Sequence, residues 1–230
     1  AVYRPPGRKP SQTGSAGQRN IRDYAPSEMV RTSTFYHLWV AYCLGATAGL
    51  MVISQLVPFA RAAGLTAAAA TFAITIGAIG NAGGRILSGW MSDTLGRLTT
   101  LRAMVLLSAI AMPLWFGVRQ ELLLFYLLAV AVYWCYGTQL SVFASTTADF
   151  YGTKNLGVNY GLLFSAWGVA GILGPIIGAQ VYDAFGDYRY AFYAAGALAL
   201  VSFGSLVVAR PPHVAAAAPV TAPVAGVARG

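Results

Sequence analysis

Residues 67–97 read AAAATFAITIGAIGNAGGRILSGWMSDTLGR, an apolar run that ends in a short polar turn. Between Ala67 and Met91 the only charged residue is Arg85. A helix that crosses the ~30 Å hydrocarbon layer of a membrane needs about 20 mostly apolar residues. The run is long enough, so it predicts a transmembrane helix that is followed by a turn.

Comparable apolar runs recur along the chain, separated by short links that carry Asp, Arg, Gly and Pro. The six predicted helices cover roughly Phe35–Ala60, Ala67–Met91, Leu101–Val118, Leu122–Thr146, Leu156–Tyr182 and Tyr190–Ala209. Helices are expected because backbone polar groups must be hydrogen-bonded internally in lipid. The alternation of a membrane β-barrel is missing from the sequence. The predicted fold class is therefore an all-α membrane protein, with a six-helix transmembrane bundle at residues 34–209.

The composition agrees with a chain dissolved in lipid. Its residues are 57% hydrophobic and 10% charged, and the mean hydropathy is +0.60. A soluble domain usually carries about a quarter of its residues as charges. The charged residues are too few to cover a water-exposed surface, which excludes a soluble globular protein.

The basic residues predict the orientation in the membrane. With Arg85 set aside as intramembrane and the N-terminus placed in the cytoplasm, 11 basic residues fall on the cytoplasmic side and 3 on the other. The cytoplasmic set is Arg4, Arg8, Lys9, Arg19, Arg22, Arg31, Arg97, Arg102, Lys154, Arg210 and Arg229, and the opposite set is Arg61, Arg119 and Arg189. By the positive-inside rule, we expect a multi-pass protein of the plasma (inner) membrane with both termini cytoplasmic. Anionic lipid, rather than nucleic acid, is the expected partner of the net charge of +8.

The two ends of the chain differ from the apolar middle. Residues 1–33 form a basic stretch and residues 210–230 are rich in Pro, Ala and Val, so both are predicted to be disordered cytoplasmic tails. Neither end resembles a signal peptide. The chain opens on Ala1 rather than Met, which suggests a piece of a longer protein.

No cofactor or metal is expected from the sequence. Cys43 and Cys135 fall inside predicted helices and are interpreted as packed thiols rather than a disulfide. Together with His37 and His213 they make no metal-site spacing. The glycines around Asn81 resemble a nucleotide-binding loop only superficially, because they lie in an apolar run without a preceding strand. The sequence also shows no nucleophile, base and acid on one face, so an enzyme is not expected.

The turn after the second predicted helix carries the most specific motif, Gly89-Trp-Met-Ser-Asp93-Thr-Leu-Gly96-Arg97. We expect Gly89 to let a neighbouring helix approach closely, and Gly96 to permit a tight turn. Asp93 is expected to accept a hydrogen bond from Arg97 or to face the positive end of a helix.

The pattern G-x-x-x-D-x-x-G-R resembles the cytoplasmic loop signature of the major facilitator superfamily, in which it acts as a conformational loop motif. The family version usually ends with a further basic residue. Here Leu98 takes that place and Arg102 lies one turn on.

Two further stretches resemble the oxalate/formate antiporter group within that superfamily. One is residues 26–39, PSEMVRTSTFYHLW, and the other is residues 150–164, FYGTKNLGVNYGLLF. The resemblance implies twelve helices in two six-helix halves, each half made of two inverted three-helix repeats. It also implies alternating access, with a substrate site near the midplane between the halves. The chain would be the C-terminal half, and its partner would be the N-terminal six-helix half of the same protein.

Arg85 is the leading candidate for binding a substrate. Arg at membrane depth costs roughly 2.5–3.5 kcal/mol and therefore usually faces a cavity. Asn81 lies one turn earlier on the same face, and a guanidinium offers a planar fork of donors to a carboxylate. In the oxalate/formate group and in monocarboxylate carriers, an arginine of this helix contacts the substrate carboxylate. The alternative is an Arg85 that reaches toward the membrane interface.

Other candidates share polar chemistry inside otherwise apolar helices. Those predicted to line the cavity with Arg85 are Tyr136, Gln139 and Asn159. One departure concerns the oxalate exchanger, which has a second basic residue where this chain has Val158. A monocarboxylate such as formate, lactate or pyruvate is therefore at least as well supported as oxalate.

The predicted function is transport of small organic anions, and two alternatives stay open. One is a carrier of the same superfamily for a neutral or drug-like substrate, in which Arg85 would be dispensable. The other is a non-transporting six-helix membrane scaffold, or a chain that homodimerises to restore a cavity.

Overall fold

The computed structural model describes residues 22–212, and within this range it contains helices and no strands. In chain order these are α1 (Pro26–Met29), α2 (Ser33–Ser54), α3 (Leu56–Ala62), α4 (Ala67–Leu95), α5 (Arg97–Gly117), α6 (Leu122–Tyr151), α7 (Leu156–Phe185) and α8 (Tyr188–Val208). The six long ones are long and apolar enough to cross a membrane. The all-α fold class with six candidate spans is confirmed, while the inverted-repeat symmetry stays a prediction.

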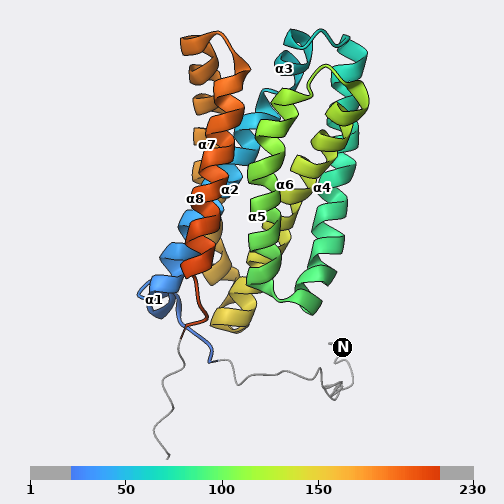
Figure 1. Ribbon diagram of the computed structural model, residues 1–230. Coiled ribbons are helices and arrows are strands. Elements are labelled where there is room, and N and C mark those ends of the chain that lie inside the picture. The colour runs from blue at the N-terminus through green and yellow to red at the C-terminus, as the bar shows by residue number, and fades with distance from the viewer. Residues whose placement is uncertain (1–21, 213–230) are drawn as a thin grey trace, which may run out of the picture.

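The long helices run alongside one another, so the bundle has two ends (Figure 1). One end carries α1 and both ends of the described chain, and we call it the basal end. The other carries α3, and we call it the distal end. The turns between α4 and α5 and between α6 and α7 also lie at the basal end (Figure 1).

The first predicted helix, Phe35–Ala60, is wrong as a single element. The structure divides it into α2 and α3, which meet at Gln55. Pro58 explains the break, because its ring clashes with the carbonyl of residue 54 and its nitrogen cannot donate to that carbonyl. Pro113 and Pro175, by contrast, lie inside continuous helices.

The predicted tail at residues 1–33 needs a correction over its described part. Residues 26–29 form α1, and Met29 is fully buried. Composition suggested disorder because few apolar residues precede Phe35, but Tyr24 and Met29 suffice to dock this segment on the bundle. Residues 1–21 and nearly all of the predicted tail at residues 210–230 lie outside the described residues.

Glycine lets α4 and α6 approach backbone to backbone. The buried residues of α4 are all small, and they are Ala70, Ala73, Gly77, Gly80, Gly84, Ser88 and Ser92. A methyl group at Gly84 would lie 3.0 Å from the carbonyl carbon of Trp134 and even closer to the carbonyl oxygen of that residue. Ser88 and Thr138 share a 2.7 Å hydrogen bond across the same seam. Small residues with hydroxyl groups are typical of tight helix pairs in membranes.

Two other close pairs complete the bundle. In the α2–α7 pair, Gly174 and Gly178 of α7 lie against the backbone of α2 at Thr47 and Met51. In the α5–α8 pair, Gly196 of α8 lies against α5. In the α4–α6 pair, the face of α4 that points away from α6 is largely exposed within the described chain. The same holds for the face of α7 that points away from α2.

Candidate functional site

The motif turn between α4 and α5 is an ionic cluster at the basal end. Gly96 has φ +91°, a conformation that favours glycine, as expected for the tight turn. Arg97 pairs with Asp93 at 2.5 Å, which confirms the expected contact. It also donates to Asp149 of α6 at 2.7 Å and to Ser92 at 2.6 Å. The sequence did not reveal Asp149, because it lies 52 residues away on another helix.

Gly89 makes no close helix contact among the described residues, and the close approach expected from the motif stays a prediction. A methyl group at Gly89 would meet no described atom within 4 Å. The stripe that contacts α6 runs through Gly80, Gly84, Ser88 and Ser92, in steps of four residues. Gly89 is one residue off this stripe, so it faces away from α6.

Arg85 and Asn81 form the pair that their spacing predicted. The Nε of Arg85 donates to Oδ1 of Asn81 at 3.0 Å. Asn81 lies one turn nearer the middle of α4, so the bond directs the guanidinium away from the basal end. This geometry disfavours an Arg85 that reaches toward the basal interface. The ion pairs found among residues 22–212 leave Arg85 without a carboxylate partner.

Tyrosines from three other helices lie within electrostatic range of this arginine. The positive charge of Arg85 acts electrostatically on the phenol groups of Tyr42, Tyr136 and Tyr160. They come from α2, α6 and α7, so residues of three further helices lie in the region of Arg85. Tyr136 was predicted from the sequence, and the structure brings it together with Arg85 and Asn81.

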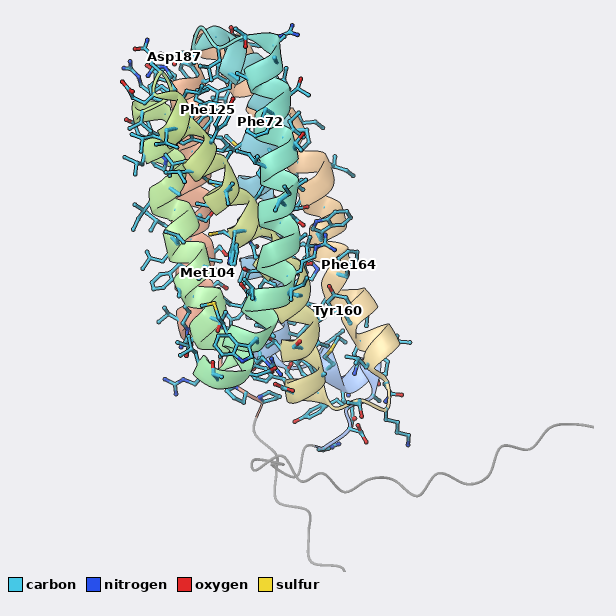
Figure 2. The ribbon with its side chains drawn as sticks, turned by 90° about the vertical axis from the view of Figure 1, so that its right-hand side faces the viewer. Phe72, Met104, Phe125, Tyr160, Phe164 and Asp187 are labelled. Atoms are coloured by element: carbon cyan, nitrogen blue, oxygen red, sulfur yellow. The ribbon has the colours of Figure 1, made fainter. Side chains whose placement is uncertain are left out.

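The aromatic side chains hold one another in place. Trp167 donates from Nε1 to the hydroxyl of Tyr136 at 2.6 Å, and Tyr160 donates to the carbonyl of Leu140 at 3.2 Å. Phe164 stacks on Trp167, with 5.0 Å between the ring centroids. Figure 2 shows Tyr160 and Phe164 in the region between α7 and the α4–α6 pair. We call Tyr42, Tyr136, Tyr160, Phe164 and Trp167 the aromatic cluster.

Tyr42 was missed by the sequence analysis. Its ring stacks on Phe143, with 4.2 Å between the centroids, and the residue is fully buried. Its hydroxyl lies beside the hydroxyl of Tyr160, but no hydrogen bond of ordinary geometry to a described residue forms there. A buried hydroxyl without a well-formed hydrogen bond costs roughly 1–3 kcal/mol, and Tyr42 differs from Gln139, which shares this feature, in belonging to the aromatic cluster. A signal was available, because Tyr42 is a polar position in an apolar run and shares a helix face with Gly45 and Gly49.

Gln139 and Asn159 lie apart from this cluster. Gln139 is buried beside Gly45 of α2 and Ser202 of α8, and its Oε1 has no partner there. Asn159 is buried at the start of α7 and donates to the backbone oxygen of Tyr24 at 3.1 Å. Both were chosen because they are polar residues in apolar runs, and the sequence did not show which neighbours they face.

The chemistry of the cluster suits an anion. Arg85 supplies a positive charge, and no carboxylate from residues 22–212 neutralises it. Phenol hydroxyls can donate to a bound oxygen, and aromatic faces exclude water. No group of His, Cys, Asp and Glu in the described range could hold a metal ion, and Cys43 and Cys135 are buried, unpaired thiols.

Comparisons with known proteins agree with this chemistry. Residues 32–228 match the model of the Major Facilitator Superfamily. The oxalate:formate antiporter of Oxalobacter formigenes is 30% identical over 200 residues, which are 85% of this chain and 47% of that protein. The monocarboxylate transporter 13 of Rattus norvegicus is 30% identical over 60% of this chain and 32% of that protein. The apicoplast pyruvate carrier 2 of Toxoplasma gondii is 29% identical over 53% of this chain and 19% of that protein. The chain thus spans about half the length of its antiporter relative, or less for the other two.

Proposed function

The chain belongs to the Major Facilitator Superfamily and is a multi-pass membrane protein, and from this premise we propose that it is the C-terminal half of a secondary transporter for small organic anions. Its relatives are transporters rather than enzymes. Their names include an oxalate:formate antiporter, a monocarboxylate transporter and a pyruvate carrier. Small carboxylates are therefore the proposed substrate class.

One observation carries this proposal. Arg85 lies far from both ends of α4, is held by Asn81 and has no carboxylate partner in the described chain. At membrane depth such a charge is costly unless it faces a cavity or a ligand. A bound carboxylate would supply the missing negative charge. Because Nε already donates to Asn81, the terminal nitrogens of the guanidinium are the donors left for the substrate.

The aromatic cluster would complete the binding of the anion. Tyr136 and Tyr160 already have partners in the structure, at Trp167 and Leu140. The hydroxyl of Tyr42 lies beside that of Tyr160, and we propose that this pair of hydroxyls offers a further donor to a substrate oxygen. Among residues 22–212, Arg85 is the one cation beside this cluster, and a single cation fits formate, lactate or pyruvate. A dicarboxylate such as oxalate would call for a second cation from elsewhere, since Val158 stands at the place where the resemblance expects one.

The open faces of α4 and α7 support a second half. Large apolar side chains on these faces are well exposed, among them Ile79 and Ile86 of α4 and Ile172 of α7. We propose that an N-terminal six-helix half covers them and closes the substrate site, and that substrate crosses by alternating access. The distribution of basic residues supports a basal end in the cytoplasm and an inner-membrane location.

Ligand-dependent thermal stabilisation of the purified full-length protein tests the anion site. The panel consists of formate, acetate, lactate, pyruvate, oxalate and a neutral sugar, because binding to the folded state must raise the unfolding midpoint. We expect a carboxylate to stabilise the protein and Arg85→Gln to abolish this response. Arg61→Gln is the matched control, since Arg61 is an exposed arginine of α3 at the distal end.

The remaining outcomes separate the alternatives. A response to the sugar alone, or one that survives Arg85→Gln, would leave the family in place and favour a carrier for neutral substrates. A protein that responds to no member of the panel and moves none of them into liposomes would favour a membrane scaffold. Tyr42→Phe is expected to weaken the carboxylate response without abolishing it.

A further inference from the structure

The two stretches that resemble the oxalate/formate group contact each other at the basal end. The first stretch is preceded by residues 22–25, which run along the turn between α6 and α7 before entering α1. The second stretch contains that turn. Neither the anion site nor the motif turn accounts for these contacts. We call residues 22–25 the strap.

Backbone and side-chain hydrogen bonds fix the strap on the turn. The amide of Tyr24 donates to the carbonyl of Tyr151 at 2.9 Å. The carbonyl of Tyr24 accepts from the side-chain amides of Asn155 at 3.0 Å and Asn159 at 3.1 Å. The carboxylate of Asp23 accepts from the amide of Lys154 at 3.1 Å. The strap thus bonds to the last residue of α6, the turn and the first residues of α7.

The strap is also packed and internally braced. The ring of Tyr24 is buried and lies edge-on to the ring of Tyr151, with 5.5 Å between centroids. Glu28 accepts from the amide of Ala25 at 2.8 Å and pairs with Arg22. These contacts hold the strap in the shape in which it meets the turn.

Gly152 makes the close docking possible. Its φ is +82°, which favours glycine, and a methyl group there would clash with the carboxylate of Asp23 and lie 2.9 Å from the Cα of that residue. Both the shape of the turn and the position of the strap therefore require glycine at residue 152.

Helix α2 is connected to the same end of α6 through Thr32. Thr32 is the N-cap of α2, and its hydroxyl shares a 3.0 Å hydrogen bond with the hydroxyl of Tyr151. Asp149, two residues before Tyr151, forms an ion pair with Arg97 of the motif turn. The end of α6 is thus bonded to α2 through Thr32, to α7 through the strap, and to α4 and α5 through the motif turn.

We propose that the strap is a permanent clamp, which holds the basal ends of α2, α6 and α7 together while the helices around the anion site move. Arg85 and Tyr136 belong to the α4–α6 pair, whereas Tyr42 and Trp167 belong to the α2–α7 pair. Along α7, Trp167 lies 11 residues from Leu156, or about 16 Å at 1.5 Å per residue. A clamp at that distance fixes the α4–α6 and α2–α7 pairs to each other at the basal end. It leaves the two pairs free to change their separation at the anion site.

Burial explains why the clamp stays closed. The side chain of Asn159 is fully buried, and its Oδ1 already lacks a partner. Release of the strap would take the acceptor from its amide nitrogen as well. Losing a partner for a buried polar group costs more than the bond contributes, so an open strap is disfavoured. This reading also gives Asn159 a structural role in place of the predicted contact with substrate.

Hydrogen–deuterium exchange on the full-length protein tests the clamp without reference to any substrate. In the parent protein we expect the amides of Tyr24 and Lys154 to exchange slowly. Asn155→Ala combined with Asn159→Ala should speed exchange by about 10- to 100-fold, both in residues 22–32 and in residues 151–156. Asn155→Ala alone serves where the double variant folds poorly. Lys154→Ala is the matched control, because its side chain is exposed and the backbone donor remains. Faster exchange in the strap alone, or in neither segment, would overturn the clamp.

Cross-linking then distinguishes a permanent clamp from a latch that must open. Asp23→Cys and Lys154→Cys place two exposed thiols on the strap and the turn, whereas the native Cys43 and Cys135 are buried. A short thiol-specific cross-linker should leave exchange of labelled formate and labelled oxalate across liposomes at the rate of the uncross-linked double variant. This arm rests on the proposed function, and a parent protein that moves neither anion is tested again with labelled lactate and pyruvate. Movement of none of the four contradicts that function and leaves hydrogen–deuterium exchange to decide on the clamp. Transport that stops on cross-linking and returns when a cleavable linker is cut would overturn the permanent clamp.

Discussion

Replacement of Gly84 by Ala should separate α4 from α6 and disturb the anion site from within. The added methyl group would lie 3.0 Å from the carbonyl carbon and from the Cα of Trp134, and closer to its oxygen. Carbon atoms prefer separations of about 3.5–4.0 Å. Because these atoms of Trp134 belong to the backbone, no rotamer change relieves the clash. The helices must therefore move apart by roughly half an ångström or more.

The expected cost follows from the contacts at this seam. Overpacking of a tight site costs about 1–3 kcal/mol. The 3.1 Å bond from Trp134 to Ser88 and the 2.7 Å bond between Ser88 and Thr138 lie next to Gly84 and would stretch. Interhelical hydrogen bonds in membranes contribute about 0.6 kcal/mol each on average. Together these effects predict a loss of about 2–4 kcal/mol, which corresponds to a fall of about 5–15 °C in the unfolding midpoint for a chain of this size.

Thermal unfolding in detergent, followed by intrinsic tryptophan fluorescence, measures this change. Gly204→Ala is the matched control, since a methyl group at Gly204 of α8 would meet no described atom within 4 Å. Because Gly84 lies between Asn81 and Arg85, the stabilisation by carboxylates should fall as well. A midpoint for Gly84→Ala within 1 °C (roughly 0.3 kcal/mol) of the control would refute the reasoning that these helices touch through backbone.

Three further substitutions test individual contacts by their effect on the unfolding midpoint. Asp149→Asn should cost about 0.5–1 kcal/mol, because its pair with Arg97 is partly exposed, and a double-mutant cycle showing no coupling to Arg97→Gln would contradict the pair. Gln139→Leu should be neutral or stabilising, since Oε1 is buried without a partner, and loss of the carboxylate response in this variant would restore Gln139 to the anion site. Arg102→Gln should cost about 1–2 kcal/mol, because Nε and Nη2 both donate to the carbonyl of Leu206 at the end of α8, and an unchanged midpoint would count against that cap.

The sequence predicted the number and type of the spanning helices because that signal is carried by single runs of residues. An apolar run of about 20 residues has few alternatives in a membrane. The boundaries were less accurate where a local rule was overlooked. Pro58 lies within the first run and ends α2 at Ser54. The average hydropathy of the run does not reveal this break, because it depends little on a single proline.

The candidate site could be predicted only in part, because its residues meet across helices. The pair of Asn81 and Arg85 followed from a spacing of four residues on one helix. Tyr42 lies 43 residues from Arg85 on a different helix, and no local pattern links them. Asp149 and Arg97 are a second example, since their contact depends on the crossing of α4, α5 and α6 at the basal end.

Arg85, Gln139 and Asn159 were all selected because they are polar residues inside apolar helices. The structure distinguishes them by whether the described chain supplies a hydrogen-bond partner or a counter-charge for each side chain. Asn159 donates to the carbonyl of Tyr24, which accounts for its amide nitrogen. Gln139 is enclosed by α2 and α8, where no ligand could reach it without separating those helices. Arg85 is exposed, its charge has no counter-charge in residues 22–212, and tyrosines from three helices lie within its electrostatic range. The counter-charge of Arg85 must therefore come from outside the described chain. A small carboxylate, the proposed substrate, would supply it without any further protein group.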